Sequence, residues 1–160
     1  ALQQGAYGSL KKPLDFDQLL ELIEKATGKG AMILLADDDK NLCANMQEVL
    51  SDKGYRVSVA YDGNTAVELA EKNNFDIMLL DMKLPALNGL ETYLAIREFR
   101  PNVVAIVITG YRQVTNELVQ RALQENVYTC LEKPIDMDRL VSLLAQIKAQ
   151  KNSGTLKKPQ

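Results

Sequence analysis

The chain has 160 residues, which is the size of one ordinary domain. Apolar residues make up 46% and charged residues 25%, and the formal net charge of −2 gives no reason to expect nucleic acid or an anionic membrane as a partner. No apolar run approaches the ~20 residues of a membrane span. Because the sequence contains no histidine, it has no histidine-based triad, zinc site or phosphocarrier of its own.

The two cysteines, Cys43 and Cys130, fall in a predicted helix and a predicted strand. Their separation does not match the spacing of metal ligands. We therefore expect buried free thiols rather than a disulfide or a metal site, which fits a cytoplasmic location.

Short apolar runs alternate with segments of helical periodicity over residues 31–150. The runs predict strands buried in a parallel sheet, and the amphipathic segments predict helices. Strands are expected at residues 31–36, 55–60, 76–80, 103–108 and 127–131. Helices are expected at residues 40–53, 62–72, 90–99, 112–125 and from 136 or 138 to 148, with Asp62 as a cap and Gly54 as a stop.

Five strands that alternate with five helices imply βαβ units and an α/β fold with helices on both faces of the sheet. Right-handed crossovers with one topological switch point predict a flavodoxin-like, doubly wound five-stranded parallel sheet of order 2-1-3-4-5. In that order the carboxyl ends of strands one, three, four and five are neighbours.

Polar residues follow these four neighbouring strands. They are Asp37, Asp38 and Asp39 after strand one, Asp81 after strand three, Thr109 after strand four, and Lys133 after strand five. Each one alone is an ordinary loop or capping residue, but together they predict one site at the edge where open α/β sheets bind ligands.

The charges of this predicted site indicate its chemistry. Clustered carboxylates repel one another unless a cation is bound, and hard oxygen ligands suit Mg²⁺. A carboxylate neutralised in this way can attack phosphorus and form an acyl phosphate. An ammonium and a hydroxyl group, supplied by Lys133 and Thr109, suit the phosphoryl oxygens.

Four motifs resemble the receiver (CheY-like) domain of two-component response regulators. They are Ile33-Leu-Leu-Ala-Asp-Asp-Asp39, Leu79-Leu-Asp-Met-Lys-Leu-Pro85 with Gly89, Ile108-Thr-Gly110 and Lys133-Pro134. Each motif is weak alone, but they occur in the family's order and spacing, and the resemblance covers residues 31–150. The resemblance implies that Asp81 is the phosphoacceptor, and that Thr109 and Lys133 bind the phosphoryl group.

The resemblance also implies the metal site and the partners. Asp38, Asp81 and the backbone carbonyl of Lys83 would bind Mg²⁺, with Asp37 assisting through water. The donor would be a sensor histidine kinase or a histidine phosphotransfer domain, and the domain would signal by a conformational change rather than act as an enzyme. A cis bond between Lys133 and Pro134 is implied as well.

One position departs from the family pattern. Family members often carry an aromatic residue three positions before the lysine, where this chain has Cys130. The nearby aromatic residue is Tyr128, which strand alternation would place on the same face as Cys130. The usual coupled movement of the threonine and the aromatic side chain is therefore in question.

Other functions fit the sequence less well. An interaction module that works without phosphorylation would not need repelling carboxylates. A phosphatase of the haloacid dehalogenase type needs a second aspartate where Lys83 stands, and a flavin site would not place Asp37 to Asp39 beside a phosphate. The chain could also be part of a hybrid sensor kinase.

The first thirty residues repeat the end of the domain at an offset of 121 positions. Lys12-Pro13 then matches Lys133-Pro134, and Leu19 matches Leu140. We expect residues 1–30 to be an extra strand and helix, the remnant of a preceding receiver domain, which could join two copies into a homodimer. Residues 151–160 are expected to be a disordered tail.

Overall fold

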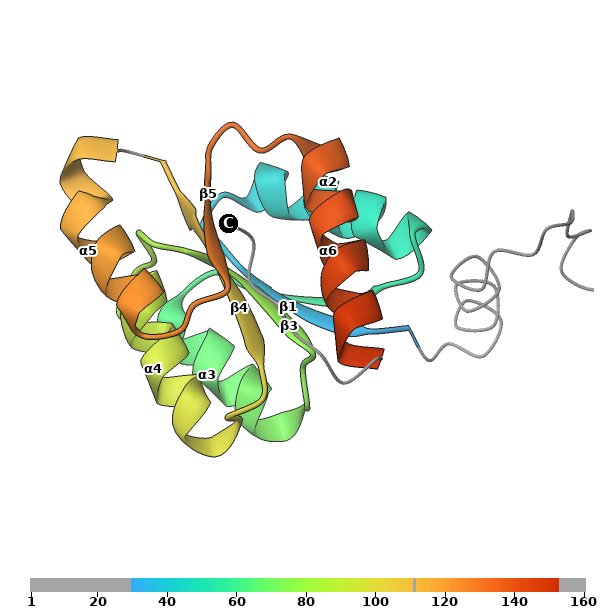
Figure 1. Ribbon diagram of the computed structural model, residues 1–160, viewed down its shortest axis with the longest axis horizontal. Coiled ribbons are helices and arrows are strands. Elements are labelled where there is room, and N and C mark those ends of the chain that lie inside the picture. The colour runs from blue at the N-terminus through green and yellow to red at the C-terminus, as the bar shows by residue number, and fades with distance from the viewer. Residues whose placement is uncertain (1–29, 111, 153–160) are drawn as a thin grey trace, which may run out of the picture.

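The computed structural model describes residues 30–110 and 112–152, and these form a doubly wound α/β fold (Figure 1). Its five parallel strands lie in the order β2-β1-β3-β4-β5, so the predicted topology is confirmed. The strands are β1 (Met32–Ala36), β2 (Arg56–Ala60), β3 (Ile77–Asp81), β4 (Val104–Thr109) and β5 (Thr129–Glu132). The helices are α2 (Lys40–Asp52), α3 (Gly63–Lys72), α4 (Gly89–Phe99), α5 (Arg112–Gln124) and α6 (Met137–Asn152).

Helix starts and stops follow local side-chain chemistry. Asp39, Asp62 and Asn88 accept a backbone N–H at the first turns of α2, α3 and α4, because the first N–H groups of a helix have no partner within it. Asn88 and Glu91 form a reciprocal capping box. Gly54 follows α2 with φ of 94°, a left-handed conformation that favours glycine.

Helices lie on both faces of the sheet (Figure 1), and an apolar layer packs them against it on each face. Helices α2 and α6 cover one face, where residues such as Met46 and Leu144 are fully buried. Helices α3, α4 and α5 cover the other face, where Ala66 and Ile96 are fully buried. Successive side chains of a strand point into opposite layers. Both layers cover β3, so it is buried at every position. Each large side chain buried in this way contributes about 1.5–3 kcal/mol.

The last helix is longer than predicted. It continues to Asn152, whereas the sequence predicted its end near residue 148 and a tail from residue 151. The reason is tertiary, because Lys151 Nζ in the last turn donates to the Asp76 carbonyl at 3.0 Å. The predicted strand and helix within residues 1–30, and the rest of the tail, lie outside the described residues.

The placement of Tyr128 corrects a prediction. Strand β5 begins at Thr129, and Tyr128 packs in the layer with α2 and α6, whereas Cys130 packs against the opposite layer. The two side chains therefore do not share a face. Strict alternation fails because Tyr128 precedes the strand, where the backbone does not follow the regular pleat.

Both cysteines are free thiols, as predicted, although only Cys43 is buried and Cys130 is half-buried. Burial raises the pKa of each thiol to about 11, with further contributions from Asp37 and Asp39 at Cys43. Both are therefore protonated at neutral pH. No helix in the described part of the chain combines the length and apolar character that crossing a membrane requires.

Candidate functional site

The carboxyl ends of four neighbouring strands bring the predicted site residues to one edge of the sheet. Asp81 is the last residue of β3 and pairs with Ile108 of β4, so Thr109 lies one position beyond it. Lys133 follows β5, and its backbone N–H donates to the Thr109 carbonyl at 2.8 Å. The parallel register thus holds these groups in place before any side-chain contact is considered.

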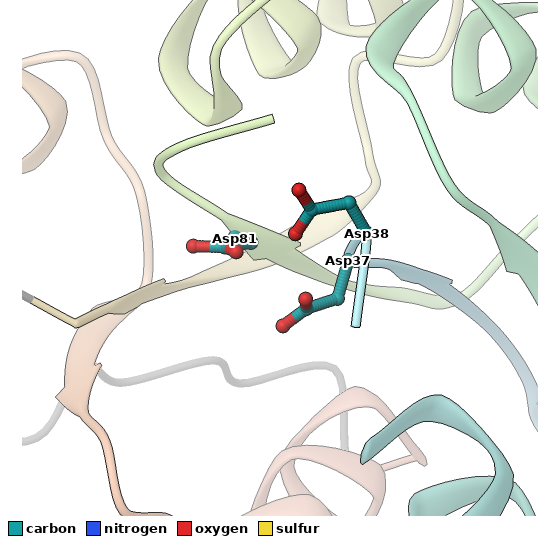
Figure 2. Close-up of side chains that lie close together, drawn as sticks. All are labelled: Asp37, Asp38 and Asp81. Atoms are coloured by element: carbon teal, nitrogen blue, oxygen red, sulfur yellow. The ribbon is translucent and has the colours of Figure 1, made fainter. Parts of the chain in front are cut away.

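Three carboxylates converge at this edge. Asp37, Asp38 and Asp81 each offer an oxygen, and these oxygens all lie within 4.8 Å of one another. Asp37 is 0% exposed and Asp81 is 4% exposed, whereas Asp38 is open to solvent. Figure 2 shows the three side chains gathered between the end of β3 and the segment after β1. The cluster is thus mostly buried but has one open side.

Lys133 provides positive charge within the cluster. Its Nζ lies 3.0 Å from Asp37 Oδ2 and 3.3 Å from Asp81 Oδ2. Burial opposes the charged form of this ammonium, but the contact with Asp37 and the charges of Asp81 and Asp37 leave its pKa raised. One ammonium between two buried carboxylates, with a third beside them, leaves the cluster with excess negative charge.

The pKa of Asp81 is raised, first by burial and then by the neighbouring charge of Asp37. The backbone N–H of Lys83, which donates to Asp81 Oδ1 at 3.2 Å, and the ammonium of Lys133 oppose this rise. Asp81 therefore holds its negative charge at a cost in free energy. That cost falls when a cation approaches the carboxylate.

Asp37 Oδ2 shows that these residues suit a metal ion. The atom is buried and lies at ion-pair distance from Lys133, yet no group in the described chain donates a well-aligned hydrogen bond to it. A buried carboxylate oxygen without such a donor is uncommon and needs a reason. With three hard oxygen donors and an open side for water, the cluster matches the preferences of Mg²⁺.

The sequence profile of the response regulator receiver domain matches residues 33–145. The chain belongs to the response regulator receiver domain family. It is 35% identical over 110 residues to a response regulator receiver protein of Anaeromyxobacter, and 32% identical over 120 residues to the transcriptional regulatory protein ZraR of Klebsiella oxytoca. These alignments cover 69% and 75% of this chain but only 45% and 27% of the relatives, so the chain spans less than half of their length.

A solved structure agrees with this assignment. The CheY-like receiver domain protein of Methanospirillum hungatei aligns with a TM-score of 0.69 and 26% identity. The alignment covers 78% of this chain and 98% of that protein. The match therefore extends over the whole of that domain, and the acidic cluster of Asp37, Asp38 and Asp81 is typical of a receiver.

The structure also separates Asp39 from the other acids of this receiver. Its side chain accepts the backbone N–H of Leu42 at 3.1 Å and caps α2. It therefore does not join the oxygen cluster. The signal in the sequence is its place one residue before the helix, where aspartate is a preferred cap.

Three further features of the receiver lie near Asp81. A side chain at Gly89 would meet the Asp81 carbonyl oxygen at 2.6 Å, so glycine is required for the start of α4 to approach β3. The peptide bond between Lys133 and Pro134 is cis, as the family resemblance implied. Thr109 is 4% exposed at the end of β4.

Proposed function

We propose that this receiver accepts a phosphoryl group on Asp81. The observation that carries the proposal is the convergence of Asp37, Asp38 and Asp81 within 4.8 Å, with Lys133 Nζ 3.3 Å from Asp81 Oδ2. The sequence match supports the same role, because it places the chain in a family of two-component signalling domains. As a receiver domain, the chain is the acceptor in the transfer and not a conventional enzyme.

The proposed reaction uses groups that already face one another. An oxygen of Asp81 forms a bond to phosphorus while the bond from phosphorus to the donor nitrogen breaks, which leaves an acyl phosphate on Asp81. Lys133 already contacts Asp81 and can shift its ammonium to a phosphoryl oxygen. The hydroxyl of Thr109 is assigned to a second phosphoryl oxygen, because β4 ends beside β3.

Asp37, Asp38, Asp81 and the backbone carbonyl of Lys83 are the groups we assign to Mg²⁺. When bound, this ion neutralises the carboxylates and the charge of the transferred phosphoryl group. Two of these groups are held before binding, because Asp37 Oδ1 accepts the Asp39 N–H at 2.9 Å and Asp81 Oδ1 accepts the Lys83 N–H at 3.2 Å. Asp38 is the exposed member and lies on the side of the cluster that is open to solvent.

The phosphoryl donor must be another molecule or domain, because this sequence contains no histidine. We assign this role to the phosphohistidine of a sensor histidine kinase or of a histidine phosphotransfer domain. Phosphorylation would then change the conformation at the ends of β4 and β5, which carry Thr109 and Lys133.

The test is intact-mass spectrometry of the chain after incubation with acetyl phosphate. We expect one added phosphoryl group in the presence of millimolar Mg²⁺ and little or none when the metal is chelated. No incorporation with Mg²⁺ present would contradict the proposal and favour an interaction module that works without phosphorylation.

We also propose that residues 1–30 belong to a preceding receiver and join two copies of the chain. The support is the sequence repeat that matches Lys12-Pro13 with Lys133-Pro134. Light scattering of the full chain should then give a dimer mass, and Leu19→Asp should give a monomer. Leu123→Asp, at an exposed position on α5, is the control and should remain a dimer. A monomeric wild-type chain would contradict the dimer.

A further inference from the structure

Cys43 contacts the acidic site through a main-chain atom. It lies in the first turn of α2 and is 1% exposed, and its Sγ lies 3.3 Å from the carbonyl oxygen of Asp37. The protonated thiol is a weak donor and the carbonyl an acceptor, so the thiol donates. This contact joins the helix to the peptide group between Asp37 and Asp38.

That peptide group lies just beyond the regular sheet. The paired registers of β1 end at Ala36, and the Asp37 N–H still donates to the Ala60 carbonyl at 3.1 Å. After Asp37 the chain turns toward Asp39, whose carbonyl accepts the Cys43 N–H at 3.0 Å. The sheet therefore fixes the N–H group of Asp37, and the Cys43 thiol fixes its carbonyl group.

Rotation of this peptide group would move Asp38. The group joins Asp37 to the exposed carboxylate that completes the cluster, and the direction of its carbonyl is linked to the backbone angles on both sides. A carbonyl without its donor would also be buried beside three carboxylates, which is unfavourable. Both effects would displace the oxygens from positions within 4.8 Å of one another.

We infer that Cys43 is a positioning residue for the metal site, because its thiol fixes the Asp37 carbonyl and thereby the direction of Asp38. The inference rests on the proposed Mg²⁺-dependent function of the same site. Cys43 itself does not contact the metal or the phosphoryl group. Its role is to keep the acids arranged for a cation before the cation arrives.

Packing is the competing role, because Cys43 also belongs to the apolar layer under α2 and α6. The two roles predict opposite orders for two variants. Cys43→Ser keeps a donor but is a poor apolar side chain, whereas Cys43→Val fills the space but has no donor. Positioning requires that Cys43→Ser bind Mg²⁺ better than Cys43→Val, and packing alone requires the reverse or no difference.

The experiment measures Mg²⁺ affinity by calorimetry on the folded 160-residue chain, with the melting temperature of each metal-free variant recorded separately. We expect Cys43→Ser to stay within about twofold of wild type and Cys43→Val to bind about fivefold more weakly, which corresponds to roughly 1 kcal/mol. Cys130→Val is the matched control, at the other free thiol, and should bind as wild type.

Two outcomes would overturn the inference: wild-type affinity in Cys43→Val, or a loss in Cys43→Ser as large as the loss in Cys43→Val. If the Ser variant is too unstable to measure, Cys43→Ala replaces it in a comparison with Cys130→Ala, and equal affinities would overturn the inference. Failure of the proposed function is distinct, because the wild-type chain itself would then bind no Mg²⁺ and incorporate no phosphoryl group.

Discussion

Two aspartates stand at opposite ends of the same strand, and their surroundings differ. Asp76 precedes β3, where its Oδ2 accepts the Met32 N–H at 2.8 Å and its carbonyl accepts Lys151 Nζ at 3.0 Å. Asp81 ends β3, where it faces two other carboxylates and one ammonium. The first aspartate ties the amino ends of β1, β3 and the end of α6 together, whereas the second contributes to a concentration of negative charge.

The difference teaches how to separate structural acids from functional ones. Main-chain N–H groups donate to acids at both ends, to Asp76 Oδ2 at one and to Asp81 Oδ1 at the other, so such bonds alone do not separate the two kinds. The acids at the carboxyl end include a buried oxygen that lacks a well-aligned donor among the described residues, and Asp81 has a raised pKa caused first by burial and then by Asp37. Such an arrangement is suited to binding a cation.

The largest expected effect is on phosphoryl transfer. Asp81→Asn should abolish incorporation from acetyl phosphate because the nucleophilic carboxylate is gone, whereas Asp76→Asn should label at the wild-type level. Intact-mass spectrometry of the two variants under identical conditions is the measurement. Wild-type labelling in Asp81→Asn, or a comparable loss in Asp76→Asn, would break the distinction between the two ends.

The next effect concerns the metal. Asp38→Ala should weaken Mg²⁺ binding by about tenfold or more, as the loss of a charged oxygen ligand is expected to do. The matched control is Asp39→Ala, which removes the adjacent acid and costs about 1 kcal/mol of stability through the lost α2 cap, but should keep its affinity. Calorimetry with Mg²⁺ measures both. Equal losses of Mg²⁺ affinity in the two variants would show that the net negative charge of this region, rather than the oxygen cluster, attracts the ion.

In the metal-free protein, the two ends should respond to mutation with opposite signs. Asp76→Ala leaves the Met32 N–H unpaired and should lower the free energy of unfolding by about 1–3 kcal/mol. Asp81→Asn removes a buried repulsive charge and should raise it by about 1 kcal/mol. Urea unfolding in the presence of a chelator measures both, and destabilisation by Asp81→Asn would contradict this account of the charge.

The stability gained by Asp81→Asn should also depend on pH. The folded-state pKa of Asp81 lies above its usual value of 3.8. The protonated form of Asp81 therefore favours the folded state over the unfolded state. That stability is present below pH about 3.8 and is lost as the pH rises through the raised pKa. The advantage of Asp81→Asn over wild type should therefore grow as the pH increases through this range. A constant difference from acid to neutral pH would be inconsistent with it.

The smallest expected effect is on the lifetime of the phosphorylated state. Lys83 follows Asp81 by two residues and is exposed, and its backbone N–H donates to Asp81 Oδ1. Its long side chain can obstruct attacking water, so Lys83→Ala should speed dephosphorylation by about threefold, a change below 1 kcal/mol in the barrier. Lys72→Ala, in the last turn of α3, is the control. The decay of the phosphorylated mass measures the rate, and an unchanged rate would remove the shielding role.

Periodicity and local signals were sufficient for most of the fold. The caps at Asp62 and Asn88 and the left-handed Gly54 are local features, so helix boundaries near them could be predicted closely. The misplaced elements depend on distant contacts. The end of α6 depends on Lys151 reaching Asp76, and the side of the sheet that Tyr128 contacts depends on where β5 begins.

The site was predictable wherever topology alone brings residues together. Strand order places Asp37, Asp81 and Lys133 at one edge, so their convergence follows from the sequence pattern. Two features of the site could be recognised only from the structure. Asp39 could have been a ligand or a cap until its contact with Leu42 was known, and nothing in the spacing of Cys43 indicates that its thiol reaches the Asp37 carbonyl.

The most direct test of the account locates the phosphoryl group. The chain is phosphorylated by acetyl phosphate with Mg²⁺ and reduced with borohydride, which converts an aspartyl phosphate to homoserine, and the modified residue is then found by tandem mass spectrometry. We predict modification at Asp81 and not at Asp37, Asp38 or Asp76. Modification at one of those three residues, with Asp81 unmodified, would contradict the central claim that the carboxyl end of β3 carries the phosphoacceptor.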